Sequence, residues 1–115
     1  MFSELNANRI GAQRGPEGYL LDPASWDENI AVTLATEEDL TLHDEYWQVL
    51  HFMRGYWHEH QVAPDVRHVV GFLAAAQGID KKAAKEKLFR MFPYGYVKQA
   101  CKIAGMIRPL AWSTG

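Results

Sequence analysis

The chain has 115 residues, of which 48% are hydrophobic, 12% aromatic and 23% charged, and its formal net charge is −2. This composition is typical of one folded domain and excludes a chain that is mainly disordered. No apolar run approaches the roughly 20 residues that span a bilayer, and no signal pattern opens the chain, so we expect a cytoplasmic protein with no membrane partner. The single cysteine excludes an internal disulfide and a cysteine-based zinc site.

Positive and negative charges are divided between two parts of the chain. Residues 1–80 contain four arginines and no lysine against thirteen Asp and Glu, whereas residues 81–115 contain eight Lys and Arg against Glu86 alone. Such a basic segment is typical of a surface that contacts an acidic protein, a nucleic acid or an anionic substrate. A basic segment packed on an acidic body is the structural alternative.

The N-terminal residues 1–21 lack a helical period and contain several glycines, which predicts a short β-hairpin with its turn near residues 14–16. A helix should then start at Asp22-Pro23, because Asp is a good N-cap and Pro is tolerated at the first helical position. This helix should end near residue 37. Its buried face would hold Trp26, Ile30 and Leu34.

Two helices follow, joined near residues 61–64 in the manner of a helix-turn-helix. Thr41 is the predicted N-cap of the first, and Pro64 the predicted start of the second. The second helix carries Arg67 and His68, which could contact bases or phosphates. Most of its other residues are apolar, so a purely structural helical hairpin is the alternative.

The final helix is predicted by apolar residues that recur at i, i+3, i+4 and i+7 from Val97 to Ala104, with Gly105 as its stop. A lysine-rich helix precedes it, with Asp80 as the predicted N-cap after a stop at Gly78. Residues 106–115 have no clear period, and we expect them to leave the body as an arm.

Together these elements predict a mainly α (α+β) fold. We expect an orthogonal bundle of about five helices with a helix-turn-helix-like pair, a short N-terminal β-hairpin and a C-terminal arm. Residues 1–115 would form a single domain, divided into the hairpin (1–21), the helical body (22–105) and the arm (106–115).

Cys101 is the sharpest candidate for chemistry. Its thiol reacts as a thiolate, a form that the neighbouring Lys98 and Lys102 would favour and that the negative end of the helix dipole would oppose. The alternative is a small buried apolar residue, because Cys101 lies on the apolar stripe of its helix. The five histidines are not spaced to share a metal ion, and no cofactor motif is present, so we expect neither a metal nor a cofactor.

The run from Phe92 to Gly105, FPYGYVKQACKIAG, followed by Arg108-Pro109, resembles the C-terminal signature of the DsrC/TusE sulfur-relay family, which includes the gamma subunit of dissimilatory sulfite reductase. The resemblance implies a small helical domain with an N-terminal hairpin, a helix-turn-helix-like pair and a mobile C-terminal arm. Further matches extend the resemblance over nearly the whole chain: Gly18-Tyr19-Leu20, Trp26, Leu42 to Trp47, Phe52-x-Arg54-x-Tyr56 and Pro64-x-x-Arg67.

The C-terminal tail departs from the family pattern. In the family, a penultimate cysteine eleven residues after the one matched by Cys101 takes sulfur as a persulfide or trisulfide, and Trp112 stands at that position here. The resemblance therefore implies that Cys101 is the only possible sulfur acceptor. Relatives without one or both cysteines exist, and a regulatory role has been suggested for them.

We therefore expect a sulfur-metabolism accessory protein that docks onto a sulfite-reductase-type or sulfurtransferase-type partner through its C-terminal helix and arm. Lys98, Lys102, Arg108 and Trp112 would make the contact. At most the protein would be a sulfur carrier, because no independent catalytic site is visible. The alternative is a cysteine-poor regulatory paralogue that binds nucleic acid through the helix-turn-helix-like pair.

Overall fold

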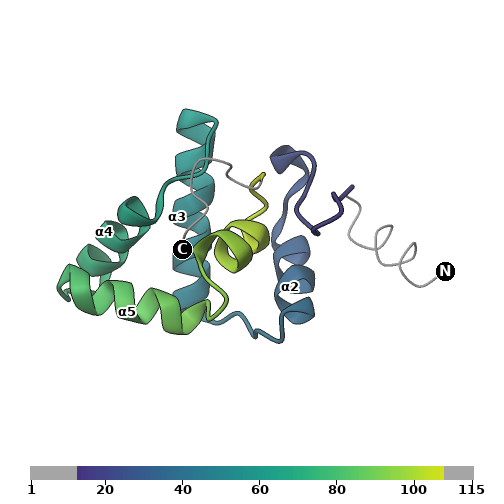
Figure 1. Cartoon of the computed structure of the whole chain (residues 1–115). Helices are drawn as coiled ribbons and strands as arrows, with labels where there is room; N and C mark the ends of the chain where they lie inside the picture. The colour runs from purple at the N-terminus through teal and green to yellow at the C-terminus, as the bar shows by residue number, and fades with distance from the viewer. Residues whose placement is uncertain (1–12, 108–115) are drawn as a thin grey trace.

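The computed structural model describes residues 13–107, which are mostly helical (Figure 1). This confirms the predicted mainly helical class. In chain order the elements are the 3₁₀-helix η1 (Pro23–Ser25), the α-helices α2 (Glu28–Glu37), α3 (Asp44–His60), α4 (Val66–Gln77) and α5 (Lys81–Met91), and the π-helix η2 (Tyr96–Cys101).

The predicted N-terminal β-hairpin is not supported in residues 13–21, and residues 1–12 lie outside the described part of the chain. Residues 13–21 make a turn with one isolated antiparallel bridge between Arg14 and Leu20, and they form no strand. Pro23 follows closely and lacks an N–H, so a ladder could not continue on this side of the turn. The chain instead curls into η1.

Several helix boundaries differ from the prediction because other residues provide the caps. Asp22 caps only the short η1, and Asp27 caps α2 by accepting a hydrogen bond from the Ile30 N–H at 2.9 Å. Helix α3 begins after His43 rather than Thr41, and no side chain caps it.

The boundaries of the next two helices follow the sequence more closely. Helix α4 starts one residue after its cap Asp65 rather than at Pro64. Gly78 ends α4 in the left-handed region, with φ 65°, and Asp80 caps α5 by accepting from the Ala83 N–H at 2.7 Å, both as predicted.

The C-terminal helix occupies the centre of the molecule. Figure 1 shows η2 in front of α3, with α2 on one side and α4 and α5 on the other. Of residues 95–106, only Lys98 and Lys102 are not buried. The sequence predicted a single buried face for this helix, whereas the structure buries every side of it except the one that carries the two lysines.

Side chains from the first half of the chain hold this central helix through its carbonyl groups. The Tyr19 hydroxyl donates to the Val97 carbonyl at 2.8 Å, and the Trp26 indole N–H donates to the Ile103 carbonyl at 2.8 Å. The Ile103 carbonyl belongs to the last turn, where carbonyls have no partner inside the helix, and buried carbonyls need donors. Trp26 supplies that donor, while Tyr19 anchors the first turn of η2 through Val97.

The helix ends in a Schellman motif centred on Gly105. The Met106 N–H donates to the Cys101 carbonyl at 2.9 Å, and the Gly105 N–H donates to the Lys102 carbonyl at 3.0 Å. Gly105 has φ 76°, and a Cβ built there would lie 2.4 Å from Cδ1 of Trp26. Met106, the first residue of the predicted arm, is buried, whereas Ile107 is exposed.

We predict that Gly105→Ala lowers the free energy of unfolding by about 2 kcal/mol or more, because it adds backbone strain at positive φ to a clash with Trp26. Gly55→Ala is the matched control: it lies in α3 with nothing within 4 Å of an added Cβ, and it should stabilise by up to about 1 kcal/mol. Urea unfolding of both variants measures the effects. Equal stabilities for Gly105→Ala and wild type would contradict the prediction.

Candidate functional site

The two lysines predicted to contact a partner lie on the one solvent-facing stripe of the C-terminal helix. Lys98 is exposed and Lys102 is half-buried, and they stand four residues apart. Lys102 Nζ lies 3.7 Å from Oε2 of Glu38 and 5.4 Å from the centre of the Tyr19 ring. Lys98 has no ion-pair or hydrogen-bond partner among residues 13–107.

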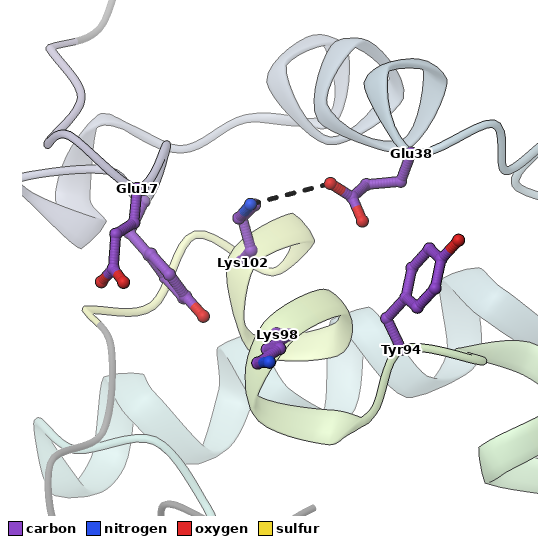
Figure 2. Close-up of a pocket in the computed structure, with 6 residues that line it drawn as sticks. Glu17, Glu38, Tyr94, Lys98 and Lys102 are labelled. Atoms are coloured by element: carbon purple, nitrogen blue, oxygen red, sulfur yellow. Dashed lines mark ion pairs between the residues drawn. The ribbon is translucent and has the colours of Figure 1, made fainter.

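These lysines line a surface pocket of about 360 Å³ whose walls come from three separate segments (Figure 2). Glu17 and Tyr19 belong to the N-terminal turn, Glu38 follows α2, and Tyr94 precedes η2. Figure 2 shows Lys102 turned toward Glu38, while Lys98 stands between Glu17 and Tyr94. The pocket therefore combines two cations, two carboxylates and two aromatic rings.

A buried glutamine fixes one wall of this pocket. Gln99, only 1% exposed, donates from Nε2 to Oε1 of Glu38 at 3.0 Å and accepts from the Tyr94 N–H at 2.9 Å. It thereby links the end of α2 to the loop before η2. We did not predict this role from the sequence, where the available signal was an uncharged polar residue next to Ala100 and Cys101 on the apolar side of the helix.

Cys101, the predicted sulfur acceptor, lies inside the protein. Its side chain has no exposed area, and burial raises the pKa of the thiol to about 12. The Tyr96 hydroxyl, which lowers this pKa, offsets only part of the effect. Any influence of Lys98 and Lys102 is outweighed, and the thiol is protonated at neutral pH in this conformation.

The other predicted site residues are separate from this pocket. Arg67 and His68 both contact the N-cap Asp65, with Arg67 Nη2 at 3.1 Å from Oδ2 and His68 Nδ1 at 3.0 Å from Oδ1. The acidic side chain thus partly neutralises the surface proposed for nucleic acid, and nucleic-acid binding is not supported. Arg108 and Trp112 lie outside the described residues.

Two further features were sought in the part of the chain that the structure describes: a metal-binding cluster and a membrane-spanning helix. Within residues 13–107, no three His, Cys, Asp or Glu side chains are grouped to hold a metal ion. None of the helices in this range is long and apolar enough to cross a bilayer.

Comparison with known proteins identifies the family of this chain. The family model described as DsrC like protein matches residues 6–111. The chain belongs to this family. It is 38% identical to the sulfurtransferase TusE of Sodalis glossinidius over 107 residues, which cover 93% of this chain and 96% of that relative. It is also 38% identical to the sulfurtransferase TusE of Escherichia coli over 94 residues, covering 82% and 85% of the two chains.

Solved structures of DsrC proteins share the fold. The NMR structure of Allochromatium vinosum DsrC superposes with a TM-score of 0.74 at 35% identity and covers 85% of this chain and 87% of that one. The crystal structure of the oxidized gamma-subunit of the dissimilatory sulfite reductase from Archaeoglobus fulgidus gives 0.72 at 29% identity, with coverages of 85% and 89%. The predicted sulfur-relay family is therefore confirmed for this DsrC-like protein.

The raised pKa of Cys101 predicts a specific pH dependence of stability. At pH 10 the unfolded thiol, with its ordinary pKa near 9.0, is ionised while the native thiol stays protonated, so stability falls as the pH rises. Between pH 7 and pH 10, wild type should lose about 1.4 kcal/mol more than Cys101→Ala. Urea unfolding at both pH values under reducing conditions measures this. The same pH dependence in both proteins would show that the native thiol titrates normally.

Proposed function

We propose that this DsrC-like protein is a docking component of a sulfur relay. It contacts a sulfurtransferase-type or sulfite-reductase-type protein through the Lys98 and Lys102 face of its C-terminal helix and through the residues that follow. The observation that carries the proposal is the burial pattern: of residues 95–106, only these two lysines reach solvent. The segment that most resembles the family signature therefore presents Lys98 to a partner, with Lys102 beside it and paired with Glu38.

The type of partner is inferred from the relatives. The Sodalis glossinidius and Escherichia coli proteins are named sulfurtransferases, and the Archaeoglobus fulgidus protein is named a gamma-subunit of a sulfite reductase. We therefore expect the partner to be a sulfurtransferase-type or a sulfite-reductase-type protein with an acidic surface that complements the lysines. Cations on a protein surface steer an acidic partner toward them and fix its orientation.

Contact rather than sulfur chemistry is the role that the thiol's surroundings support. A persulfide forms on an accessible thiolate, and Cys101 is buried and protonated. Trp112 stands where the family tail carries its sulfur-binding cysteine, and a tryptophan side chain has no group that can hold sulfur. That Cys101 accepts sulfur stays a prediction, and it requires the C-terminal helix to open first.

The residues after the helix are included because of their chemistry and their place in the chain. Ile107 is 59% exposed at the last described position, so the chain reaches the surface there. Arg108 and Trp112 follow, and Arg and Trp are the residue types most enriched at the energetic centres of interfaces.

Removing the C-terminal residues should be tested with a boundary that leaves the helix intact. The Met106 N–H closes the helix on the Cys101 carbonyl, so the deletion should begin at residue 108 rather than 106. We predict that deletion of residues 108–115, or the charge reversal Lys98→Glu, weakens partner binding at least about tenfold. Lys85→Glu on the exposed face of α5 is the control and should bind within about twofold of wild type.

Biolayer interferometry against the purified sulfurtransferase and sulfite-reductase homologues of the source organism measures these affinities. Circular dichroism confirms that each variant is folded. Wild-type affinity for both test variants, or no binding of wild type to any of these homologues, would refute the docking proposal.

A further inference from the structure

A second hollow adjoins the charged pocket. It has a volume of about 170 Å³, its walls include Pro16, Leu21 and Ile107, and it shares Glu17 and Tyr19 with the first pocket. We call the two neighbouring hollows together the η2 groove: Tyr94 and the two lysines line the first, and Ile107 lines the second. One end of the groove is charged and the other is apolar.

Exposed apolar side chains gather along this groove. Five large hydrophobic side chains in the described part of the chain are exposed, and three of them border the groove: Leu21 at 57%, Tyr94 at 71% and Ile107 at 59%. Scattered exposed apolar residues are ordinary, but Leu21 and Ile107 line the same hollow, and exposed apolar residues grouped in this way are typical of a binding surface. Tyrosine is also enriched at interfaces.

The charged end has one cation without an internal partner. Glu38 is satisfied by Gln99 at 3.0 Å and by Lys102 at 3.7 Å, so Lys102 already faces a carboxylate. Lys98 has no such neighbour in the described residues, and Figure 2 draws no ion pair to it. An incoming carboxylate would therefore find its counter-ion at Lys98.

The walls of the groove are joined before any ligand arrives. Arg14 in the N-terminal turn makes a two-pronged ion pair with Glu37 of α2, at 2.9 Å and 2.7 Å, and its Nε donates to the Gly18 carbonyl at 2.9 Å. Lys102 and Gln99 tie the helix to Glu38 on the same side. A preformed site loses less conformational entropy on binding.

We propose that the η2 groove binds an extended peptide segment of the partner that presents a carboxylate to Lys98 and an apolar side chain to the hollow beside Leu21 and Ile107. This inference rests on the proposed docking function and specifies the chemistry of the docked segment. A nucleic acid fits less well because its row of phosphates would extend beyond Lys98 to Glu38 and to the apolar hollow, whereas a segment with one carboxylate can place it at Lys98 alone. A purely apolar segment would leave Lys98 desolvated and without a counter-ion.

The test is an NMR titration of the full ¹⁵N-labelled chain with three short probes. Acetyl-Leu-Glu-Leu-amide carries both features, acetyl-Leu-Gln-Leu-amide lacks the charge, and acetyl-Ser-Glu-Ser-amide lacks the apolar side chains. We expect the first probe to shift the amides of residues 15–21 and 94–107. The other two probes should bind at least about threefold more weakly.

Two variants locate the charge contact. Lys98→Met should weaken the Leu-Glu-Leu probe about threefold or more, whereas Lys85→Met on α5 should leave it unchanged. Equal binding of the Leu-Gln-Leu probe, or shifts centred elsewhere, would overturn the inference. So would equal shifts with inorganic phosphate at matched ionic strength, which would indicate a simple anion site. Binding only after deletion of residues 108–115 would identify the chain's own C-terminus as the occupant.

The outcomes separate this inference from the proposed function. If the partner binds and the probes do not bind in the groove, the docking function stands and the peptide assignment fails. If the probes bind the groove and no sulfurtransferase or sulfite-reductase homologue binds the protein, the groove assignment stands and the docking function fails.

Discussion

The buried guanidinium of Arg54 joins the beginning and the end of the described chain. It donates to the Pro23 carbonyl at 2.8 Å and to the Ala104 carbonyl at 3.1 Å, and it lies over the rings of Trp26 and Trp57 at 4.7 Å and 5.0 Å. Burial lowers the pKa of this group, and a buried charge is tolerated only where hydrogen bonds and aromatic faces replace water. The segment before α2, helix α3 and the end of the C-terminal helix must therefore be in place together.

This constraint accounts for two features of the C-terminal helix, the buried thiol and the exposed lysine. Hydrogen bonds from Arg54, Trp26 and Tyr19 hold the helix so that Cys101 lies in the core and Lys98 lies outside. The same packing that keeps the thiol protonated thus creates the cationic face. In this conformation the thiol is inside the protein, and its exposure would require breaking the hydrogen bonds that hold the C-terminal helix in place.

Local signals were sufficient to predict several elements from the sequence. Asp80 and Gly78 act as predicted because a cap depends on a few adjacent residues. The predicted helix starts at Asp22 and Thr41 were wrong, because Asp27 and His43 are the N-cap residues of α2 and α3. The choice among neighbouring cap candidates depends on which side chains the core must bury. The family resemblance, carried by the C-terminal signature, was confirmed by the comparisons.

The candidate site was less accessible to prediction because it is built from distant segments. The turn at Glu17, the residue Glu38 after α2 and Tyr94 meet only in the folded chain. For Cys101, the sequence correctly placed the thiol on an apolar stripe. Whether the lysines lower the thiol pKa more than desolvation raises it depends on how deeply the thiol is buried, which no local sequence pattern reveals.

The most direct test of the account is the rate at which native Cys101 reacts with a thiol reagent in wild type and in Arg54→Met, with Arg67→Met as an exposed control. Loss of the buried arginine leaves the Ala104 carbonyl without a donor and the Pro23 carbonyl with the Trp26 N–H alone, which should lower the free energy of opening by about 3 kcal/mol and speed labelling roughly 100-fold. Circular dichroism should show that the Arg54 variant remains folded, and the Arg67 variant should label at the wild-type rate. An unchanged labelling rate in Arg54→Met would contradict the claim that this side chain holds the thiol inside.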